Sequence, residues 1–281
     1  MGKRFDTLLF PGGLKKAFTL SYDDGVVQDK RLIALFDKHH VRGTFNIGYG
    51  VLGYKPEGPF NVDKVETYEV KALYRDHEVA GHGLYHSDLT ALKEPYMMYE
   101  ILEDKAKLEQ LVDKPLKMFA YPFGLFDDKV KDGLWKAGYK GARTVKSTHG
   151  FELPEDTLEW NPTCHHNDEK LMELLERFVT ENSMKSQLFY LWGHAYEFDR
   201  DKNWEVIEKA LAYIDEHREG IWFADNGQIL DYLQAYDMLE YSVDGSMIHN
   251  PSAIDVEIAT SFKTKELLKA GETTKIRETE L

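Results

Sequence analysis

The chain has 281 residues, of which 42% are hydrophobic and 13% aromatic, so it is long and apolar enough to bury the core of one large domain. Its formal net charge of −14 disfavours nucleic acids and anionic membranes as partners, because both are negatively charged. Cys164 is the only cysteine, so no disulfide can form within the chain. Neither end resembles a targeting signal, and no run of about 18 apolar residues is present. We therefore expect a cytoplasmic protein.

Apolar, β-rich runs alternate with amphipathic segments along most of the chain, a spacing typical of βα units. The predicted strands cover residues 17–22, 43–47, 78–81, 117–121, 142–145, 158–162, 188–192 and 221–224. The predicted helices cover residues 28–39, 65–74, 96–111, 127–137, 168–180, 204–217 and 227–235. Seven or eight parallel strands of this kind favour an α/β fold with a closed or nearly closed barrel. A doubly wound open sheet is the alternative, which periodicity does not separate from a barrel.

The last forty or so residues differ in character from the rest. Residues 241–246 and 253–258 read as short strands around a turn at residues 249–252, and residues 263–281 are polar and charged. We therefore divide the chain into a barrel domain, residues 1–238, and a short β appendage with a polar C-terminal tail, residues 239–281.

Carboxylates and imidazoles follow several of the predicted strands, at the end where α/β barrels place their chemistry. Asp23 and Asp24 follow the first strand, and adjacent carboxylates can serve one as a metal ligand and the other as a base. His82 and His86 are four residues apart, and on a helical turn that spacing would bring both rings to one metal ion. His194 follows a later strand. Each piece alone is also compatible with an ordinary turn or with half-buried histidines bonded to the backbone.

The order of four short motifs resembles the polysaccharide deacetylase family, carbohydrate esterase family 4, also called the NodB-homology domain. These motifs are TLSYDDG at 19–25, GHGLYHS at 81–87, FAYPFG at 119–124 and LWGH at 191–194. The similarity spans roughly residues 15 to 235. It implies an incomplete (β/α) barrel of about seven parallel strands, here with a small C-terminal β extension.

The resemblance also implies roles for the motif residues. Asp23 would be the catalytic base and His194 the general acid. Asp24, His82 and His86 would hold a divalent metal. Zn²⁺ is the ion we expect from this ligand set, and Co²⁺, Ni²⁺ or Mn²⁺ would also suit it.

Other motif residues would contact the substrate or the oxyanion. In the family the third motif forms one wall of the groove and presents a backbone N–H to the oxyanion, which here would be that of Phe123. Leu191 would line an acetate pocket, and Tyr121 and Trp192 stand at predicted strand ends where aromatic rings could stack on sugar faces or fill the core. Trp160 is the remnant of a motif that supports the catalytic histidine.

Several positions depart from the family pattern. Gly83 replaces the Ser or Thr that usually follows the first histidine of the second motif. The third motif lacks the Arg that pairs with the base, and we take Arg143, at the next strand end, as the candidate substitute; a surface ion pair is its other interpretation. The segment Cys164-His165-His166 does not suggest a thiol mechanism, because adjacent side chains on an extended segment point apart. These three residues could still contact substrate.

We therefore expect a metal-dependent hydrolase that removes acetyl groups from an N- or O-acetylated carbohydrate, either a small molecule or an oligosaccharide. An acid and a base acting on one carbonyl predict a bell-shaped pH profile. Two alternatives stay open. One is a hydrolase of another C–N bond, such as that of a ureide or amide, on the same barrel, and the other is a catalytically silent carbohydrate-binding module.

Overall fold

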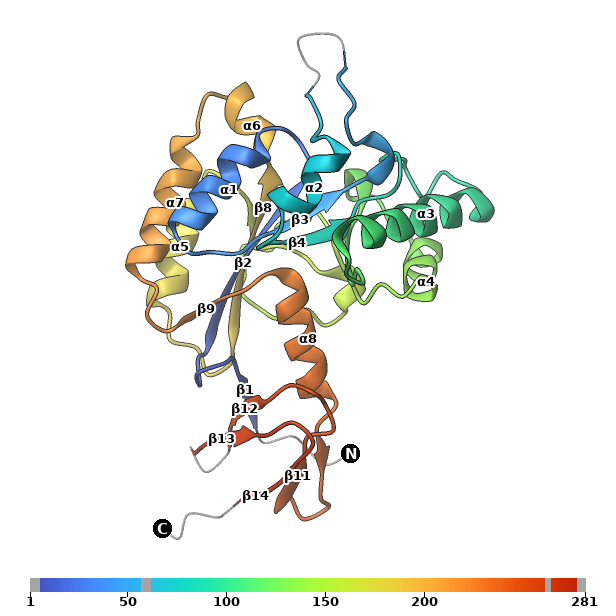
Figure 1. The fold of residues 1–281 in the computed structure, drawn as a ribbon. Coiled ribbons are helices and arrows are strands. Elements are labelled where there is room, and N and C mark those ends of the chain that lie inside the picture. The colour runs from blue at the N-terminus through green and yellow to red at the C-terminus, as the bar shows by residue number, and fades with distance from the viewer. Residues whose placement is uncertain (1–5, 57–61, 261–263, 277–281) are drawn as a thin grey trace.

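A curled sheet of parallel strands forms the centre of the molecule (Figure 1). The computed structural model describes residues 6–56, 62–260 and 264–276. The strands of this sheet are β2 (Lys16–Asp23), β3 (Thr44–Ile47), β4 (Glu78–Gly81), β5 (Met118–Ala120), β6 (Gly141–Arg143), β7 (Cys164–His165), β8 (Gln187–His194) and β9 (Ile221–Phe223). Seven of them follow the order β6-β5-β4-β3-β2-β8-β7, and β9 pairs with the start of β2. This order confirms the incomplete (β/α) barrel and excludes the doubly wound sheet.

The barrel is open between β6 and β7, where the predicted strand at 158–162 is wrong. Residues Thr157–Glu159 form a 3₁₀ turn (η4), because the Asp156 carboxylate accepts the Leu158 N–H at 2.8 Å and folds the chain back. Only Trp160 forms a single parallel bridge, to Arg143. Pro162 has no N–H to donate to a neighbouring strand.

Alternation along β2 separates the packing face of the sheet from its polar inner face. Phe18, Leu20 and Tyr22 are buried in the larger hydrophobic core together with residues of the surrounding helices. The intervening residues point the other way, because successive side chains of a strand face opposite sides. There the Thr19 hydroxyl contacts Asn226 Oδ1 at 2.8 Å, and Ser21 Oγ accepts from Asn46 Nδ2 at 2.8 Å. A column of polar side chains therefore leads along the inner face toward the end of β2.

Helices cover the outer face of the sheet, with α1, α5 and α7 on one side and α3 and α4 on the other (Figure 1). The longer helices are α1 (Asp29–Lys38), α3 (Glu94–Val112), α4 (Asp128–Lys136), α5 (Leu171–Thr180), α7 (Glu205–Glu216) and α8 (Asn226–Asp237). The expected helix at 65–74 is reduced to η2 (Thr67–Glu69) and α2 (Val70–Leu73), and a short helix that we did not predict, α6 (Ala195–Arg200), follows β8 directly. The remaining 3₁₀ turns are η1 (Tyr49–Val51) and η3 (Pro122–Gly124). No helix among the described residues is both long and apolar enough to cross a membrane.

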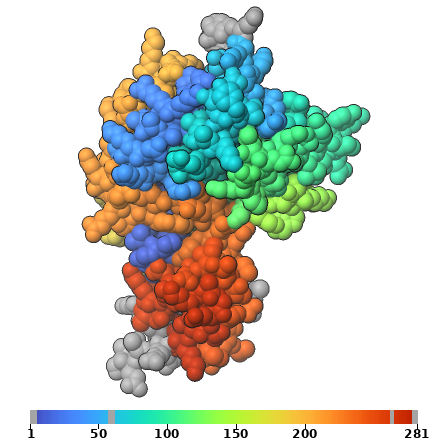
Figure 2. Space-filling model, viewed as in Figure 1, coloured from blue at the N-terminus to red at the C-terminus, as the bar shows by residue number. Residues whose placement is uncertain are grey.

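Two small antiparallel sheets form a lobe beneath the barrel (Figures 1 and 2). One contains β1 (Thr7–Leu9), β12 (Val256–Ala259) and β13 (Lys265–Leu268), and the other contains β10 (Glu240–Tyr241), β11 (Met247–His249) and β14 (Thr273–Lys275). The N-terminal strand β1 thus pairs with β12 across most of the chain length. The segment from residue 263, which we expected to be only a polar tail, contributes β13 and β14; residues 263 and 277–281 lie outside the described part.

Candidate active site

Asp23 ends β2 at the mouth of the barrel and is buried. The strand register places it between Asn46 on β3 and His194 on β8. Asn46 Nδ2 donates to Asp23 Oδ1 at 2.8 Å, and the Arg143 guanidinium donates to Asp23 Oδ2. Burial by itself would raise the pKa of Asp23, but the charges of Arg143 and His194 outweigh it and hold the pKa below its ordinary value. Asp23 is therefore a fixed, ionised carboxylate.

Arg143 comes from β6, on the far side of the inner face, and its side chain has no exposed surface. Its guanidinium lies 4.3 Å from the centre of the Trp192 ring and also donates to the Thr144 carbonyl at 3.1 Å. Arg143 thus contacts the Asp23 carboxylate, and its role as the substitute for the missing arginine stays a prediction. The interpretation of Arg143 as a surface ion pair is wrong, since both partners are buried.

Asp24 leaves the strand with a φ of 83°, which turns its side chain away from that of Asp23. Its Oδ1 atom lies 3.9 Å from His82 Nε2, 3.7 Å from His86 Nε2 and 3.6 Å from Lys64 Nζ. Burial alone would raise the pKa of Asp24, but the positive charge of Lys64, together with that of His194, lowers it below the ordinary value. The carboxylate is thus held in its charged form facing both rings.

His82 and His86 do not lie on a helix, so the reason we gave for their convergence is wrong. They occupy the loop after β4, and His86 has a φ of 56° and follows Gly83, whose φ is 75°. These left-handed residues tighten the turn, in which the His86 N–H reaches the Gly83 carbonyl at 3.4 Å. The two rings meet edge to face with their centres 4.7 Å apart. A compact turn, and not a helix, therefore brings the two imidazole rings together.

The tautomer of His82 is fixed by the backbone. Burial lowers the pKa of His82, so the ring is neutral, and its Nδ1 lies 2.8 Å from the Ala120 carbonyl, which can only accept. Nδ1 therefore carries the proton and Nε2 carries the lone pair. Nε2 is buried and has no hydrogen-bond partner within the described residues. Burial likewise lowers the pKa of His86, to about 4.

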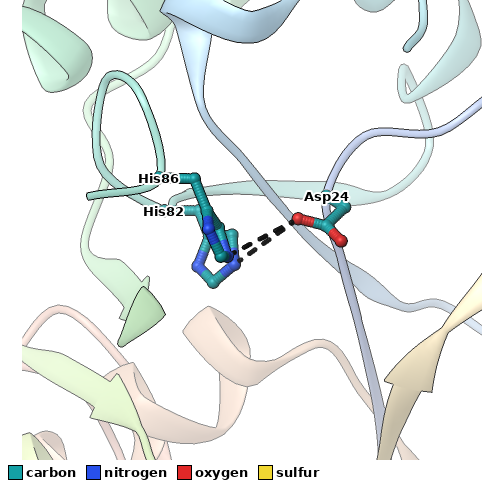
Figure 3. A group of neighbouring side chains, drawn as sticks. All are labelled: Asp24, His82 and His86. Carbon is teal, nitrogen blue, oxygen red and sulfur yellow. Dashed lines mark ion pairs between the residues drawn. The ribbon is translucent and has the colours of Figure 1, made fainter. Parts of the chain in front are cut away.

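Asp24, His82 and His86 together fit a divalent metal ion. Their ligand atoms lie within 4.8 Å of one another, and Figure 3 shows the carboxylate facing both imidazole edges. Two ligands bound to one Zn²⁺ at about 2.0–2.1 Å can be no more than about 4 Å apart. The separations of 3.9 and 3.7 Å from Asp24 Oδ1 satisfy that limit. A histidine that donates one ring nitrogen to a carbonyl and offers the other is also the usual arrangement of a metal ligand.

His194, the last residue of β8, faces Asp23 on one side and Glu197 on the other. Its Nε2 lies 3.9 Å from Asp23 Oδ2, and its Nδ1 lies 3.4 Å from Glu197 Oε2. Burial lowers the pKa of His194, but Glu197 and then Asp23 and Asp24 outweigh burial and raise it above its ordinary value. A carboxylate behind the ring keeps the imidazole protonated.

Two aromatic residues of the third motif lie in different surroundings. The Phe123 ring is 61% exposed and meets the His86 ring edge to face at 4.4 Å, so it stands at the rim of the site. Tyr121 is buried, stacks on Phe126 with ring centres 4.7 Å apart, and donates its hydroxyl to the Leu158 carbonyl at 2.7 Å. The structure therefore does not bring the Tyr121 ring to a surface that a sugar could reach.

Successive side chains of β8 point to opposite sides of the sheet, which separates Leu191 from Trp192 and His194. Trp192 shares the face of His194, where it packs against that ring and over Arg143. Leu191 points to the opposite side and is fully buried in the larger hydrophobic core, so the expectation that it lines the pocket is wrong. Trp160 is buried against Tyr190, and no contact with His194 is described.

Three residues of the site escaped sequence reasoning. Asn46 lies on the inner face of β3, and its pairing with Asp23 follows from strand alternation once the register is known. Glu197 stands three residues after His194, a spacing that would have been informative had helix α6 been predicted. Lys64 reaches Asp24 from a loop, and no sequence pattern indicated that contact.

Comparison with known proteins finds similarity to polysaccharide deacetylases. The family model for polysaccharide deacetylases matches residues 12–142. No curated protein matches the chain. A polysaccharide deacetylase from Bacillus cereus is 24% identical, with a TM-score of 0.43; the match covers 51% of this chain and only 45% of that one.

Two further solved structures share the fold over more of the chain. A Mycobacterium smegmatis protein, provisionally assigned as a polysaccharide deacetylase, is 15% identical with a TM-score of 0.61, and the match covers 86% of this chain and 98% of that one. A mutant of a pseudoenzyme from carbohydrate esterase family 4 is 17% identical with a TM-score of 0.51, covering 79% and 68%. The sequence similarity to polysaccharide deacetylases therefore lies in residues 12–142, which carry the first three motifs.

Proposed function

We propose that this chain is a metal-dependent hydrolase that removes acetyl groups from an N- or O-acetylated carbohydrate. The observation that carries the proposal is the convergence of Asp24, His82 and His86 beside a separate carboxylate, Asp23, that is buried against Arg143. Such an arrangement separates the binding of a metal from the handling of protons. The family match supports a carbohydrate as the substrate.

Asp24, His82 and His86 would hold the metal, which when bound supplies Lewis acidity toward a carbonyl and acidifies water. Asp23 stays ionised because Arg143 and Asn46 hold its two oxygens, so its carboxylate can accept a proton from the attacking water. His194 is kept protonated by Glu197 and can donate a proton to the departing amine or alcohol through Nε2. Phe123 would present its backbone N–H to the developing oxyanion, where such a donor contributes about 2.7–4 kcal/mol.

The test combines elemental analysis of the purified protein with acetate release from acetylated chito-oligosaccharides. Asp23→Asn should retain the metal and lose at least about 100-fold in rate, since general base catalysis contributes that much. Asp24→Ala should lose metal at this site together with activity. Asp113→Asn is the matched control, because Asp113 is an exposed residue that pairs with Lys71 at the surface.

Three results would contradict the proposal. An unchanged rate of acetate release in Asp23→Asn would show that Asp23 is not the catalytic base. Turnover of ureides or other amides without acetate release would indicate the alternative C–N hydrolase. Binding of the oligosaccharide without turnover by the metal-loaded protein would indicate a silent module.

A further inference from the structure

A second cluster of ligand-type atoms lies on the side of His194 that faces away from Asp23. Glu197 Oε2 is 3.0 Å from His165 Nε2 and 3.3 Å from His166 Nε2, and these three atoms all lie within 4.8 Å of one another. His194 Nδ1 is 3.4 Å from the same oxygen. The two adjacent histidines reach one carboxylate because β7 ends at His165 and the chain turns at His166. His165, His166 and Glu197 therefore bring three ligand-type atoms together.

Several polar atoms of this cluster are buried without hydrogen bonds. The His166 side chain has no exposed surface, and neither of its ring nitrogens has a hydrogen-bond partner in the described part of the chain. Glu197 Oε2 and His194 Nδ1 are also buried without a hydrogen-bond partner there. A buried polar group left unpaired costs about 1–3 kcal/mol. A cation held between these atoms would compensate all of them at once.

The surroundings hold the His166 ring rigidly. It is stacked on Phe198, with ring centres 4.1 Å apart, and lies nearly parallel to Tyr22 at 5.7 Å. Gly193 leaves the space that the ring occupies, because a Cβ atom at this position would lie 1.9 Å from His166 Nδ1. An imidazole fixed next to a carboxylate suits a metal ion and serves no packing need that an apolar ring would not meet.

We propose that His165, His166 and Glu197 form a second site for a divalent transition metal ion such as Zn²⁺. Two imidazoles and one carboxylate form an established zinc ligand set. Ligands at about 2.0–2.1 Å in a tetrahedral shell are about 3.4 Å apart, and the two imidazole nitrogens lie 3.0 and 3.3 Å from Glu197 Oε2. The proposal shares no metal ligand with the proposed function, although Glu197 also faces His194, the proposed general acid.

The test counts Zn²⁺ ions bound per chain by equilibrium dialysis after chelator treatment. Wild-type protein should bind two. Glu197→Gln and His166→Phe should each bind one, and Phe retains the stacking between Tyr22 and Phe198. Asp24→Ala should also bind one, and Asp24→Ala combined with Glu197→Gln should bind none. Glu208→Gln, which alters an exposed pair with Arg31, is the matched control and should bind two.

The variants separate the two sites. One ion in wild type that persists in Glu197→Gln and is lost in Asp24→Ala would overturn the second site and leave the first. One ion that is lost in Glu197→Gln and persists in Asp24→Ala would support the second site and contradict the metal of the proposed function. Denaturant unfolding of each variant shows whether it is folded, and Glu197→Gln carries the test should His166→Phe fail to fold.

Discussion

At the scale of single residues, the buried pair of Asp23 and Arg143 illustrates how this site maintains a charge away from water. A carboxylate and a guanidinium in low dielectric surroundings depend on each other, because each alone would carry a large desolvation cost. Asn46 and Trp192 complete the shell around them. The pair thus links the charge state of the proposed base to the stability of the fold.

Arg143→Met should lower the free energy of unfolding by about 3–5 kcal/mol, because it leaves Asp23 as an uncompensated buried charge. Adding Asp23→Asn to that variant should recover part of the loss, since no charge then stays buried. Urea denaturation of the two single variants and the double variant measures this coupling. Arg75→Met is the control, as Arg75 pairs with Asp76 in solvent and should change stability by less than about 1 kcal/mol. Strictly additive losses would show that the two side chains do not depend on each other.

Asp29, at the start of α1, is a second buried carboxyl group, and it affects stability rather than chemistry. Burial raises its pKa from 3.8 to about 8, although the Tyr74 hydroxyl donates to it at 2.6 Å. Between about pH 4 and pH 8 the folded protein keeps a proton that the unfolded chain has released. The contribution of this group to stability therefore falls as the pH rises through that window.

Asp29→Asn should flatten the pH dependence of unfolding, because the amide has no proton to lose. In the wild type this group contributes a slope of up to about 1.4 kcal/mol per pH unit between pH 4 and 8. Urea midpoints of both proteins at pH 5 and pH 8 provide the measurement. Asp37→Asn, at an exposed position of the same helix, should retain the wild-type slope. The same slope in Asp29→Asn would mean that Asp29 is ionised in the folded protein.

At the scale of elements, helix α3 holds the loop that carries the proposed metal ligands. Glu100 accepts the Tyr85 N–H at 2.9 Å and the Ser87 hydroxyl at 3.0 Å. One turn later, Asp104 accepts the His82 N–H at 3.3 Å. The loop between His82 and His86 therefore owes its shape to two carboxylates on a neighbouring helix.

Glu100→Ala should weaken Zn²⁺ binding at the first site by about 10–100-fold, the usual effect of removing a group that orients a metal ligand. Competition with a chromophoric chelator measures the Zn²⁺ affinity. Both proteins also carry Glu197→Gln, so that only Zn²⁺ bound at the first site is measured. Glu103→Ala is the matched control, because Glu103 is a partly exposed residue of the same helix and pairs with Lys107 at 3.6 Å. Equal Zn²⁺ affinities in Glu100→Ala and Glu103→Ala would show that Glu100 does not hold the metal-binding loop in place.

The outcome of sequence reasoning also differs between elements. The regular strands were predictable because they are short apolar, β-rich runs between amphipathic segments, and the register then brings Asp23 on β2 to Asn46 on β3. The convergence of His82 and His86 was predicted for the wrong reason, since left-handed residues in a loop, not helical spacing, bring the rings together. The break in the barrel near Trp160 was not predicted. The composition of residues 158–162 is strand-like, but the turn held by the Asp156 carboxylate overrides it.

At the scale of the whole molecule, the contact between the two ends of the chain could not be predicted from local patterns. Strand β1 pairs with β12 over about 250 intervening residues, and short runs such as Thr7–Leu9 carry no signal for a partner so distant. A second hydrophobic cluster joins these strands to the last barrel helix. It contains Leu8, Phe10, Leu230, Leu233, Ile248, Val256, Ile258 and Leu268. The lobe and the barrel therefore share buried surface.

Tyr232 of α8 connects the helix to both strands, because its hydroxyl donates to the Leu9 carbonyl at 2.7 Å and accepts the Glu257 N–H at 2.9 Å. A chain ending at residue 238 should consequently lose stability in the barrel itself. Each fully buried aliphatic side chain that is removed contributes about 1.5–3 kcal/mol. The exposed faces of β1 and α8 should also bind a hydrophobic dye. A chain ending at residue 276, which keeps all the described strands, is the control, and an unchanged urea midpoint after truncation at residue 238 would show that the barrel folds without the lobe.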